Sequence, residues 1–207
     1  MHLIIIALII SYLIGSIPTA YIFGRLIKGI DIRKFGSGNV GATNALRVLG
    51  RWPGITVLAL DIFKGFIAVI LLGNFFFSKI NLAQEVYSII LGIACIAGHN
   101  WTIFLKFKGG KGIAITLGVL LALAVQLPGI RIVIFCLIAC WIIIFAINRI
   151  VSLASLACAV LLPVFMLVFK QSAALMFSSI ILSAFVILRH KNNLSRIIQR
   201  KESPIKF

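Results

Sequence analysis

The chain has 207 residues, of which 62% are hydrophobic and 12% charged, and its mean hydropathy is +1.18. A soluble core of this size cannot bury so much apolar surface, so the composition predicts an integral membrane protein and excludes an ordinary globular one. Twenty Lys and Arg against four Asp and Glu give a formal charge of +16, which indicates contact with a membrane surface and with anionic substrates.

Other classes of partner and site fit the composition poorly. Nucleic acid is not expected, because the basic residues are spread over short loops and no nucleic-acid-binding motif is present. The four cysteines all fall inside apolar runs, without the spacing of a zinc site or a disulfide framework, so we expect them to pack as small side chains. The N-terminus has no basic region and no small-residue cleavage site, which predicts a retained span.

Seven apolar runs approach or exceed the roughly 20 residues that a transmembrane helix needs. In chain order they are Leu3–Gly24, Trp52–Leu72, Glu85–Gly98, Ile113–Leu127, Ile132–Ile147, Ile150–Phe169 and Ser172–Leu188. The second run contains Asp61 and Lys64, three residues apart, and we expect them to share a helix face and neutralise one another. The sequence therefore predicts an all-α polytopic membrane protein with seven transmembrane helices and a single domain over residues 1–207.

Basic residues are distributed unevenly over the predicted loops. Sixteen Lys and Arg lie in loops 25–51 and 106–111, at residue 149 and in the tail 189–207, whereas the opposite loops hold three. Because cytoplasmic loops are enriched in Lys and Arg, this asymmetry predicts that the N-terminus is outside and the C-terminus is cytoplasmic. The Gly-rich, Asn-rich and basic stretches then share the cytoplasmic face, which disfavours a channel open to both sides.

The first predicted loop contains Gly36-Ser-Gly-Asn-Val-Gly-Ala-Thr-Asn44, followed by Arg47. Three glycines in six residues can expose successive backbone N–H groups to an anion. The neutral side chains that can add hydrogen bonds are Ser37, Asn39, Thr43 and Asn44. A short helix beginning at residue 42 or 43 would strengthen anion binding, and Arg47 would close on a phosphate. The alternative is a glycine-rich turn whose polar groups satisfy one another.

The second loop, Lys106-Phe-Lys-Gly-Gly-Lys-Gly112, places three ammonium groups and three glycines between two uncharged apolar runs. This pattern predicts a phosphate-binding loop at the membrane surface, and the alternative is a loop held by anionic lipid. A Walker ATP site is excluded, because Leu105 stands where the first glycine is needed and Gly112 follows Lys111 in place of Ser or Thr. So few carboxylates also argue against a two-metal phosphotransferase site, and we expect no metal or other cofactor.

Three smaller groups of polar residues lie at the same predicted face. His99 ends the third run and is either a structural hydrogen-bonding residue or a substrate contact. His190 and Asn193 lie three apart beyond the last run, on one face if the helix continues, and either bind a hydroxyl or phosphate or serve as an interfacial anchor. Ser152 and Ser155 either cap the sixth helix or offer hydroxyls to a substrate.

Together these segments resemble the bacterial acyl-phosphate-dependent glycerol-3-phosphate acyltransferases of the PlsY type, over essentially the whole chain. The segments that resemble the family's four motifs, in order, are Gly36–Asn44 with Arg47, Gly98–Gly112, Arg149–Ser155 and His190–Asn193. The chain departs from the family pattern at three positions, with Thr102 in place of proline, Ile115 in place of threonine and Asn192 in place of an acidic residue.

The resemblance implies transfer of a fatty acyl group from acyl phosphate to the 1-hydroxyl of glycerol 3-phosphate. The products are lysophosphatidic acid and inorganic phosphate, in the first acylation of phospholipid synthesis. It also implies a multi-pass enzyme of the bacterial cytoplasmic (inner) membrane, in contact with lipid, and a peripheral partner enzyme that makes the acyl phosphate. The His-x4-Asp signature expected of the other glycerophosphate acyltransferase type is absent from this sequence.

The resemblance also implies roles for individual residues. The catalytic residues that we expect are Ser37, Arg47, Lys111, His190 and Asn193. The expected substrate-binding and phosphate-binding residues are Gly38, Asn39, Gly41, Thr43, Asn44, His99, Lys106, Lys108, Gly109, Gly110, Gly112, Ser152 and Ser155. In this hypothesis the first loop and Arg47 hold one phosphate, and the three lysines with the amides of residues 109 and 110 hold the other. Ser37, His190 and Asn193 orient the glycerol.

We expect positioning and charge stabilisation to suffice for this reaction, because acyl phosphate is an activated mixed anhydride. The proton passes to a substrate phosphate oxygen, or else to His99 or His190 as a general base. A transporter of phosphate or organophosphate and a structural membrane protein are the competing classes. The one-sided placement of polar residues counts against the first, and the glycine-rich loops count against the second.

Overall fold

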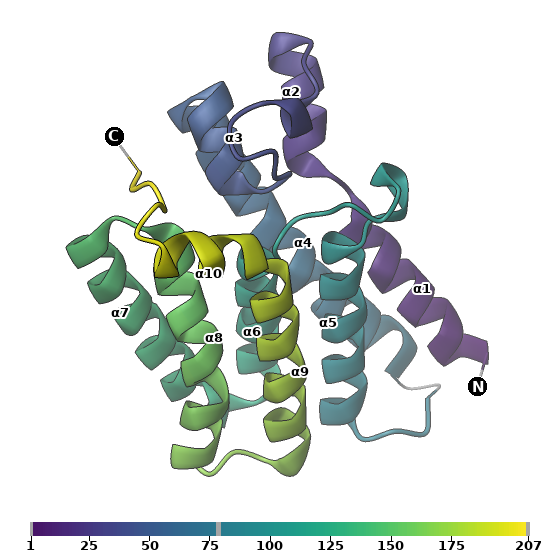
Figure 1. Cartoon of the computed structure of the whole chain (residues 1–207). Helices are drawn as coiled ribbons and strands as arrows, with labels where there is room; N and C mark the ends of the chain where they lie inside the picture. The colour runs from purple at the N-terminus through teal and green to yellow at the C-terminus, as the bar shows by residue number, and fades with distance from the viewer. Residues whose placement is uncertain (1, 78–79, 206–207) are drawn as a thin grey trace. The chain divides into compact units, whose positions relative to one another are not determined.

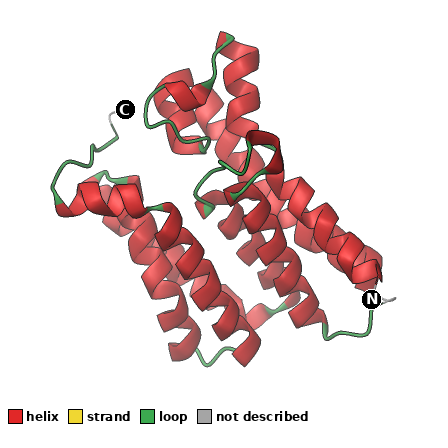
Figure 2. Cartoon of the chain, turned by 45° about the vertical axis from the view of Figure 1, so that its right-hand side comes forward, coloured by secondary structure: helices red, strands yellow, loops and turns green. Residues whose placement is uncertain are grey.

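The computed structural model describes residues 2–77 and 80–205, which consist of helices joined by loops (Figure 2). The chain divides into two compact units, Met1–Leu123 and Ala124–Phe207. Each unit contains its own set of packed helices. The single domain expected over residues 1–207 stays a prediction.

Thirteen helical segments are described in these residues (Figure 1). Those that lie wholly or mostly in the first unit are α1 (His2–Ser16), α2 (Thr19–Lys28), the 3₁₀ helix η1 (Ile32–Lys34), α3 (Ala42–Leu49), α4 (Arg51–Phe77), α5 (Gln84–Asn100), the 3₁₀ helix η2 (Ile103–Leu105) and α6 (Ile113–Gln126). The second unit contains the 3₁₀ helix η3 (Pro128–Ile130), α7 (Arg131–Asn148), α8 (Val151–Val168), α9 (Ala173–Arg189) and α10 (Lys191–Ile198).

Five helical segments of the described chain are long and apolar enough to cross a membrane, and the bent pair α9–α10 would make a sixth. The five are His2–Lys28, Arg51–Phe75, Gln84–Leu105, Pro128–Asn148 and Val151–Val168. Helix α6 has 14 residues, fewer than the roughly 20 that span a bilayer at right angles. The structure confirms the all-α class, whereas the count of seven spans and the orientation of the termini stay predictions.

Helix α1 packs along α5 in the first unit, and hydroxyl groups join the two helices. The Ser11 hydroxyl donates to the carbonyl oxygen of Leu91 at 2.7 Å. The Tyr12 hydroxyl donates to the carbonyl oxygen of Trp101, just past the end of α5, at 2.6 Å. These bonds satisfy polar groups within the protein, and they fix α1 beside the segment that leads into the lysine-rich loop.

The first predicted span is not one continuous helix, because the chain breaks between α1 and α2 at Pro18. Proline has no N–H and cannot continue the helical hydrogen bonds, so carbonyl groups at the end of α1 need other donors. The Thr102 hydroxyl donates to the Ser16 carbonyl oxygen at 2.6 Å. The Lys64 ammonium donates to the Ile17 carbonyl oxygen at 2.9 Å. Side chains from other elements therefore satisfy the break, as a low-dielectric surrounding requires.

Asp61 and Lys64 on α4 form the ion pair that the sequence predicts. Lys64 Nζ lies 2.9 Å from Asp61 Oδ1, and the two side chains are 7% and 1% exposed, respectively. Thr19, at the start of α2, donates its hydroxyl to the same carboxylate oxygen at 2.5 Å. The buried pair thus holds both ends of the break, Lys64 on the α1 side and Asp61 on the α2 side.

In the second unit, α8 packs against both α7 and α9. The indole N–H of Trp141 donates to the Ser155 hydroxyl at 3.3 Å, which joins α7 to α8. The chain bends by 66° between α9 and α10, so α10 lies across the ends of α8 and α9 (Figure 1). The continuous helix that would have placed His190 and Asn193 on one face is therefore not formed, because α9 ends at Arg189 and His190 lies at the bend.

We expect Lys64→Met to lower the free energy of unfolding by about 3–5 kcal/mol, because it leaves the buried Asp61 carboxylate without its cationic partner. It also removes the donor to the Ile17 carbonyl oxygen. The measurement is an unfolding titration of the purified protein in mixed micelles.

The matched control is Arg33→Gln, which breaks the more exposed pair of Arg33 with Asp31 and should cost less than about 1 kcal/mol. Equal losses in the two variants would contradict a structural role for the buried pair.

Candidate active site

The first glycine-rich loop is folded around one buried side chain, that of Asn44, which is 1% exposed. Its Oδ1 accepts a hydrogen bond from the backbone N–H of Ser37 at 2.8 Å. Its Nδ2 donates to three carbonyl oxygens, of Asn39 at 2.9 Å, Phe35 at 3.1 Å and Ile32 at 3.3 Å. The side-chain amide therefore pairs with backbone groups across the interior of the loop. This matches the alternative given above, a glycine-rich turn whose polar groups satisfy one another.

Glycine at position 36 is required by this arrangement. The residue has φ +60°, which side chains rarely adopt, and a Cβ placed there would lie 2.3 Å from Asn44 Oδ1. Any larger residue would push away the side chain that closes the loop. The glycine thus serves the folding of the loop, and it brings Ser37 to an exposed position at the loop's surface.

Helix α3 begins at Ala42, as the sequence suggests, with Gly41 as its N-cap and no side-chain cap. Its first N–H groups therefore lie at the end of the glycine-rich loop, where an anion is favoured. Arg47, one turn further along the helix, is exposed, whereas Thr43 is half-buried. Asn39 Oδ1 is buried and has no hydrogen-bond partner among the described residues.

The lysine-rich loop is pinned to the end of α5 by two backbone hydrogen bonds. The N–H of Gly110 donates to the His99 carbonyl oxygen at 2.9 Å, and that of Gly109 to the Asn100 carbonyl oxygen at 3.2 Å. The sequence suggested that these two amides would bind phosphate. In the structure they are engaged by the chain's own carbonyl groups, which corrects the amide role to a structural one. The groups that remain to bind an anion, as the sequence predicts for this loop, are its lysines.

The lysines of this loop are presented on a strained stretch of backbone. Lys106 and Phe107 have φ values of +54° and +60°, a left-handed conformation that costs non-glycine residues of order 1 kcal/mol each. Lys106 and Lys108 are exposed, and Lys111 is half-buried. Two neighbouring residues in this conformation turn the chain sharply within the short segment that carries the three lysines.

His99 lies between the buried ion pair and the lysine-rich loop. Its side chain is 7% exposed, and its Nδ1 is 4.0 Å from Asp61 Oδ1. On the other side, a Cβ placed at Gly110 would lie 2.1 Å from His99 Nε2. The loop backbone therefore covers the imidazole, and only glycine allows this close approach.

Asn100, next to His99, is a residue that the sequence analysis did not single out. Its side chain is fully buried, and neither Oδ1 nor Nδ2 has a hydrogen-bond partner among the described residues. A Cβ at Gly112 would lie 2.7 Å from Asn100 Oδ1, so the amide lies directly against the end of the lysine-rich loop. An unpaired buried amide is costly, which marks this position as one that can receive a ligand group.

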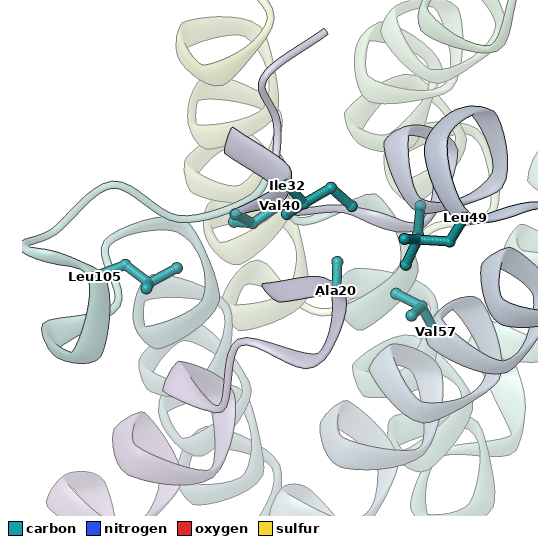
Figure 3. Packing of buried hydrophobic residues seen from close by; sticks show 7 residues of the cluster. Ala20, Ile32, Val40, Leu49, Val57 and Leu105 are labelled. Carbon is teal, nitrogen blue, oxygen red and sulfur yellow. The ribbon is translucent and has the colours of Figure 1, made fainter. Parts of the chain in front are cut away.

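The two glycine-rich loops share one hydrophobic cluster (Figure 3). Its buried members are Ala20, Ile32, Val40, Ala45, Leu49, Val57 and Leu105. Val40 belongs to the first loop, and Leu105 immediately precedes the lysines of the second, although they are far apart in the chain. Burial of these side chains in one cluster places the two predicted anion-binding loops next to each other.

Two of the departures from the family pattern have clear structural roles. Thr102 is 2% exposed and donates to the end of α1, as described above. It also accepts a hydrogen bond from the backbone N–H of Phe104 at 3.3 Å, which caps η2. Ile115 is fully buried on α6 and acts in packing, whereas the hydroxyl of the adjacent Thr116 has no partner among the described residues.

The polar residues of the second unit meet at Glu202, a residue of the C-terminal tail. Its Oε1 accepts hydrogen bonds from the Ser152 hydroxyl at 2.8 Å and from Asn193 Nδ2 at 2.5 Å. Its Oε2 accepts from Arg196 Nε at 2.5 Å. Burial alone would raise the pKa of the Glu202 carboxyl, but these hydrogen bonds outweigh it and hold the pKa below the ordinary value. Glu202 is therefore a carboxylate at neutral pH.

The structure places the remaining predicted residues of this unit as follows. Ser155 is 1% exposed and accepts the Trp141 N–H, so its contact joins two helices. His190 is 2% exposed, and its Nδ1 lies 2.8 Å from the Val186 carbonyl oxygen. Since a carbonyl oxygen only accepts, Nδ1 carries the proton, and in the neutral ring Nε2 is an acceptor.

The sequence analysis missed Glu202 as well as Asn100. A signal was present, since Glu202 is the only acidic residue after Glu85 and it stands in a basic tail. Within residues 2–77 and 80–205, no group of three or more His, Cys, Asp and Glu side chains is placed to hold a metal ion. What the described site residues offer is cationic side chains, hydroxyls, amides, two imidazoles and the Glu202 carboxylate.

We expect Gly110→Ala to displace His99 and to lower the free energy of unfolding by about 1–3 kcal/mol, because the added methyl group overlaps the imidazole. The measurement is the thermal unfolding midpoint, together with the NMR signals of the His99 ring. Gly129→Ala is the matched control, since a Cβ there meets nothing closer than 3.4 Å. An unchanged His99 signal in Gly110→Ala would contradict the packing of the loop on this side chain.

Comparisons of the sequence with known proteins all identify the same family. A sequence model of the glycerol-3-phosphate acyltransferase family matches residues 5–200. A glycerol-3-phosphate acyltransferase of Fusobacterium nucleatum is 41% identical over 200 residues, which cover 97% of each chain. The glycerol-3-phosphate acyltransferase 2 of Moorella thermoacetica is 41% identical over 198 residues, which cover 96% of this chain and 95% of the relative.

Solved structures agree with the sequence comparison. A crystal structure of PlsY (YgiH), an integral membrane glycerol 3-phosphate acyltransferase, in its glycerol 3-phosphate form superposes with a TM-score of 0.85 at 34% identity, covering 98% of this chain and 96% of that one. The lysophosphatidic acid form gives a TM-score of 0.82 at 33% identity, with 98% and 95% covered. The chain therefore belongs to the glycerol-3-phosphate acyltransferase family and is a multi-pass membrane enzyme of the PlsY type.

Proposed function

We propose that this enzyme acylates the 1-hydroxyl of glycerol 3-phosphate with acyl phosphate as the donor, giving lysophosphatidic acid and inorganic phosphate. The observation that carries the proposal is the shared cluster of Val40 and Leu105, which brings two basic, glycine-rich loops together. Both substrates are phosphates, and two adjacent cationic loops suit two anions. The relatives named above are glycerol-3-phosphate acyltransferases, and one of the solved PlsY structures is that of the glycerol 3-phosphate form.

In the first unit, we assign one phosphate to the surface of the loop that Asn44 closes. The groups offered there are the Ser37 hydroxyl, the first N–H groups of α3 and the Arg47 guanidinium, which can donate two parallel hydrogen bonds. Gly38, Asn39, Gly41 and Thr43 line the same turn. Asn44 itself holds the loop in shape, because its side-chain amide already makes the four hydrogen bonds described above.

The second phosphate is assigned to Lys106, Lys108 and Lys111. Gly109, Gly110 and His99 support this loop, since their contacts are with one another and with the chain. We add Asn100 to the binding set, because its unpaired amide lies against Gly112. Three ammonium groups compensate the charge that gathers on the phosphate when it leaves.

In the second unit, we assign the glycerol hydroxyls to Ser152, His190 and Asn193. All three side chains offer hydrogen-bonding atoms that suit hydroxyl groups. The pair Ser152 and Asn193 is ordered by Glu202. Ser155 supports this unit through Trp141.

The reaction balances without a covalent enzyme intermediate. The 1-hydroxyl oxygen of glycerol 3-phosphate attacks the acyl carbonyl carbon, and the bond from that carbon to the phosphate oxygen breaks. The hydroxyl proton passes to the departing phosphate, which is a base within reach of the reacting oxygen. His190 is the rival proton acceptor through Nε2, whereas His99 is covered by the loop backbone.

We further propose seven membrane spans in a bacterial cytoplasmic membrane, with the N-terminus outside and the active site on the cytoplasmic face. The apolar helices and the unequal distribution of Lys and Arg over the loops support this topology. A short α6 is tolerated because it packs in protein and is not fully exposed to lipid. Acyl phosphate would come from a peripheral partner enzyme, and the product would enter the surrounding lipid.

The test is phosphate release by the purified protein in lipid, given acyl phosphate or acyl-CoA, with and without glycerol 3-phosphate. We expect release from acyl phosphate only when glycerol 3-phosphate is present. Lys111→Ala should lower kcat about 10²–10³-fold, as loss of one charge-stabilising donor does elsewhere.

Lys34→Ala, which removes an exposed lysine of η1, is the control and should leave the rate unchanged. Equal use of acyl-CoA would overturn the proposed donor. Movement of glycerol 3-phosphate across sealed vesicles without acyl phosphate would favour a transporter.

A further inference from the structure

Residues 103–108, which we call the aromatic turn, present large apolar side chains and lysines side by side. The apolar side chains are at least half exposed: Ile103 50%, Phe104 58% and Phe107 57%. Lys106 and Lys108 are exposed as well. Contiguous exposed apolar side chains next to charged ones are typical of a surface that contacts another molecule.

The backbone of the aromatic turn is held by its own hydrogen bonds. The Thr102 carbonyl oxygen accepts from the N–H of Leu105 at 3.2 Å and from that of Phe107 at 2.9 Å. The N–H of Lys108 donates to the Leu105 carbonyl oxygen at 3.2 Å. The Leu105 side chain is 5% exposed and packs in the cluster described above. Exposure of the other apolar side chains is therefore a property of the folded turn and not of a loose segment.

Phe107 combines two unfavourable features. Its φ of +60° is a left-handed conformation that glycine adopts without strain, and its ring is largely exposed. In water, the strained backbone and the unburied ring would each cost free energy. An apolar surrounding outside the chain would remove the second cost, which indicates that the ring has a partner there.

The position of the aromatic turn in the chain indicates what that partner is. The candidate membrane span Gln84–Leu105 ends within the turn, and Ile113 begins the next apolar helix, α6. A turn between two apolar helices of a membrane protein lies at the surface of the bilayer. Aromatic side chains are favoured at that level, where lysines reach the headgroups, and anionic lipids attract them. The apolar and the basic side chains thus both match the chemistry of an anionic lipid surface.

We propose that the aromatic turn is a membrane-docking surface, whose apolar side chains enter the boundary between the headgroups and the acyl chains of an anionic bilayer. Docking places Lys106 and Lys108 at the depth of the lipid phosphates, where the phosphate of an amphiphilic acyl donor also lies. The inference does not depend on the proposed function, because the depth of the turn can be measured without any substrate.

The experiment uses Phe104→Trp as a fluorescent reporter, in full-length protein reconstituted into vesicles of phosphatidylglycerol and phosphatidylethanolamine. The difference between the variant and wild-type spectra isolates the added indole, because the three native tryptophans are common to both. We expect its emission to lie at shorter wavelength than that of tryptophan in water. Lipids brominated on the upper part of their acyl chains should quench most of it, and acrylamide should quench little.

Two further variants make the result decisive. Ile103→Trp places a second reporter on the same turn and should repeat the result, so the test stands even if Phe104→Trp folds poorly. Lys201→Trp is the matched control, because Lys201 is exposed in a polar segment of the tail. Its added emission should be quenched by acrylamide and spared by the brominated lipids.

The role of lipid charge is tested by replacing phosphatidylglycerol with zwitterionic phosphatidylcholine. Quenching of the Phe104→Trp reporter by brominated lipids should fall, because the two lysines lose their attraction to the surface. Equal quenching in the two kinds of vesicle would overturn the choice of an anionic surface as the partner.

Two other results would overturn the inference as a whole. Strong quenching by acrylamide with none by the brominated lipids would show that the aromatic turn lies in water. Protection of both turn reporters from both quenchers would show that protein covers the turn in place of lipid.

Discussion

Burial of Leu105 in the same cluster as Ile32 and Val40 is the constraint on which the site in the first unit depends. Two loops rich in glycine and charge have little apolar surface of their own with which to hold a fixed position. A leucine at the start of one loop and a valine within the other supply that surface. The hydrophobic effect is non-directional, but close packing in a small cluster fixes relative positions well. Mutual placement of the two loops is thus achieved by apolar side chains, and the polar groups are then presented at their surface.

Within each loop, the backbone is satisfied by the chain itself before any ligand arrives. Asn44 fills the interior of the first loop, and the carbonyl groups at the end of α5 engage the amides of Gly109 and Gly110. A preformed loop loses little conformational freedom when it binds an anion, which favours charge stabilisation in a transition state. The buried pair of Asp61 and Lys64 does the same at the helix break around Pro18, where Lys64 donates to the Ile17 carbonyl oxygen.

Much of this arrangement can be predicted from the sequence. Apolar runs locate the helices, and the spacing of Asp61 and Lys64 predicts their ion pair. Glycine with asparagine marks the first loop, and glycine with lysine marks the second. Other features follow from contacts between distant residues, which no local pattern encodes. The bonds of Glu202 to Ser152, fifty positions away, and of Thr102 to the end of α1 are examples. Pro18 did carry a local signal for the helix break, but the hydropathy of its neighbours concealed it.

The account makes one central claim, that the two glycine-rich loops form a single packed unit. A double-mutant cycle of Val40→Ala and Leu105→Ala tests it most directly, with the free energy of unfolding as the measured quantity. Residues that share a cluster should couple, so we expect the double variant to depart from the sum of the two single losses by about 0.5–3 kcal/mol. Losses that add to within about 0.3–0.5 kcal/mol would show that the loops are independent and would contradict the account.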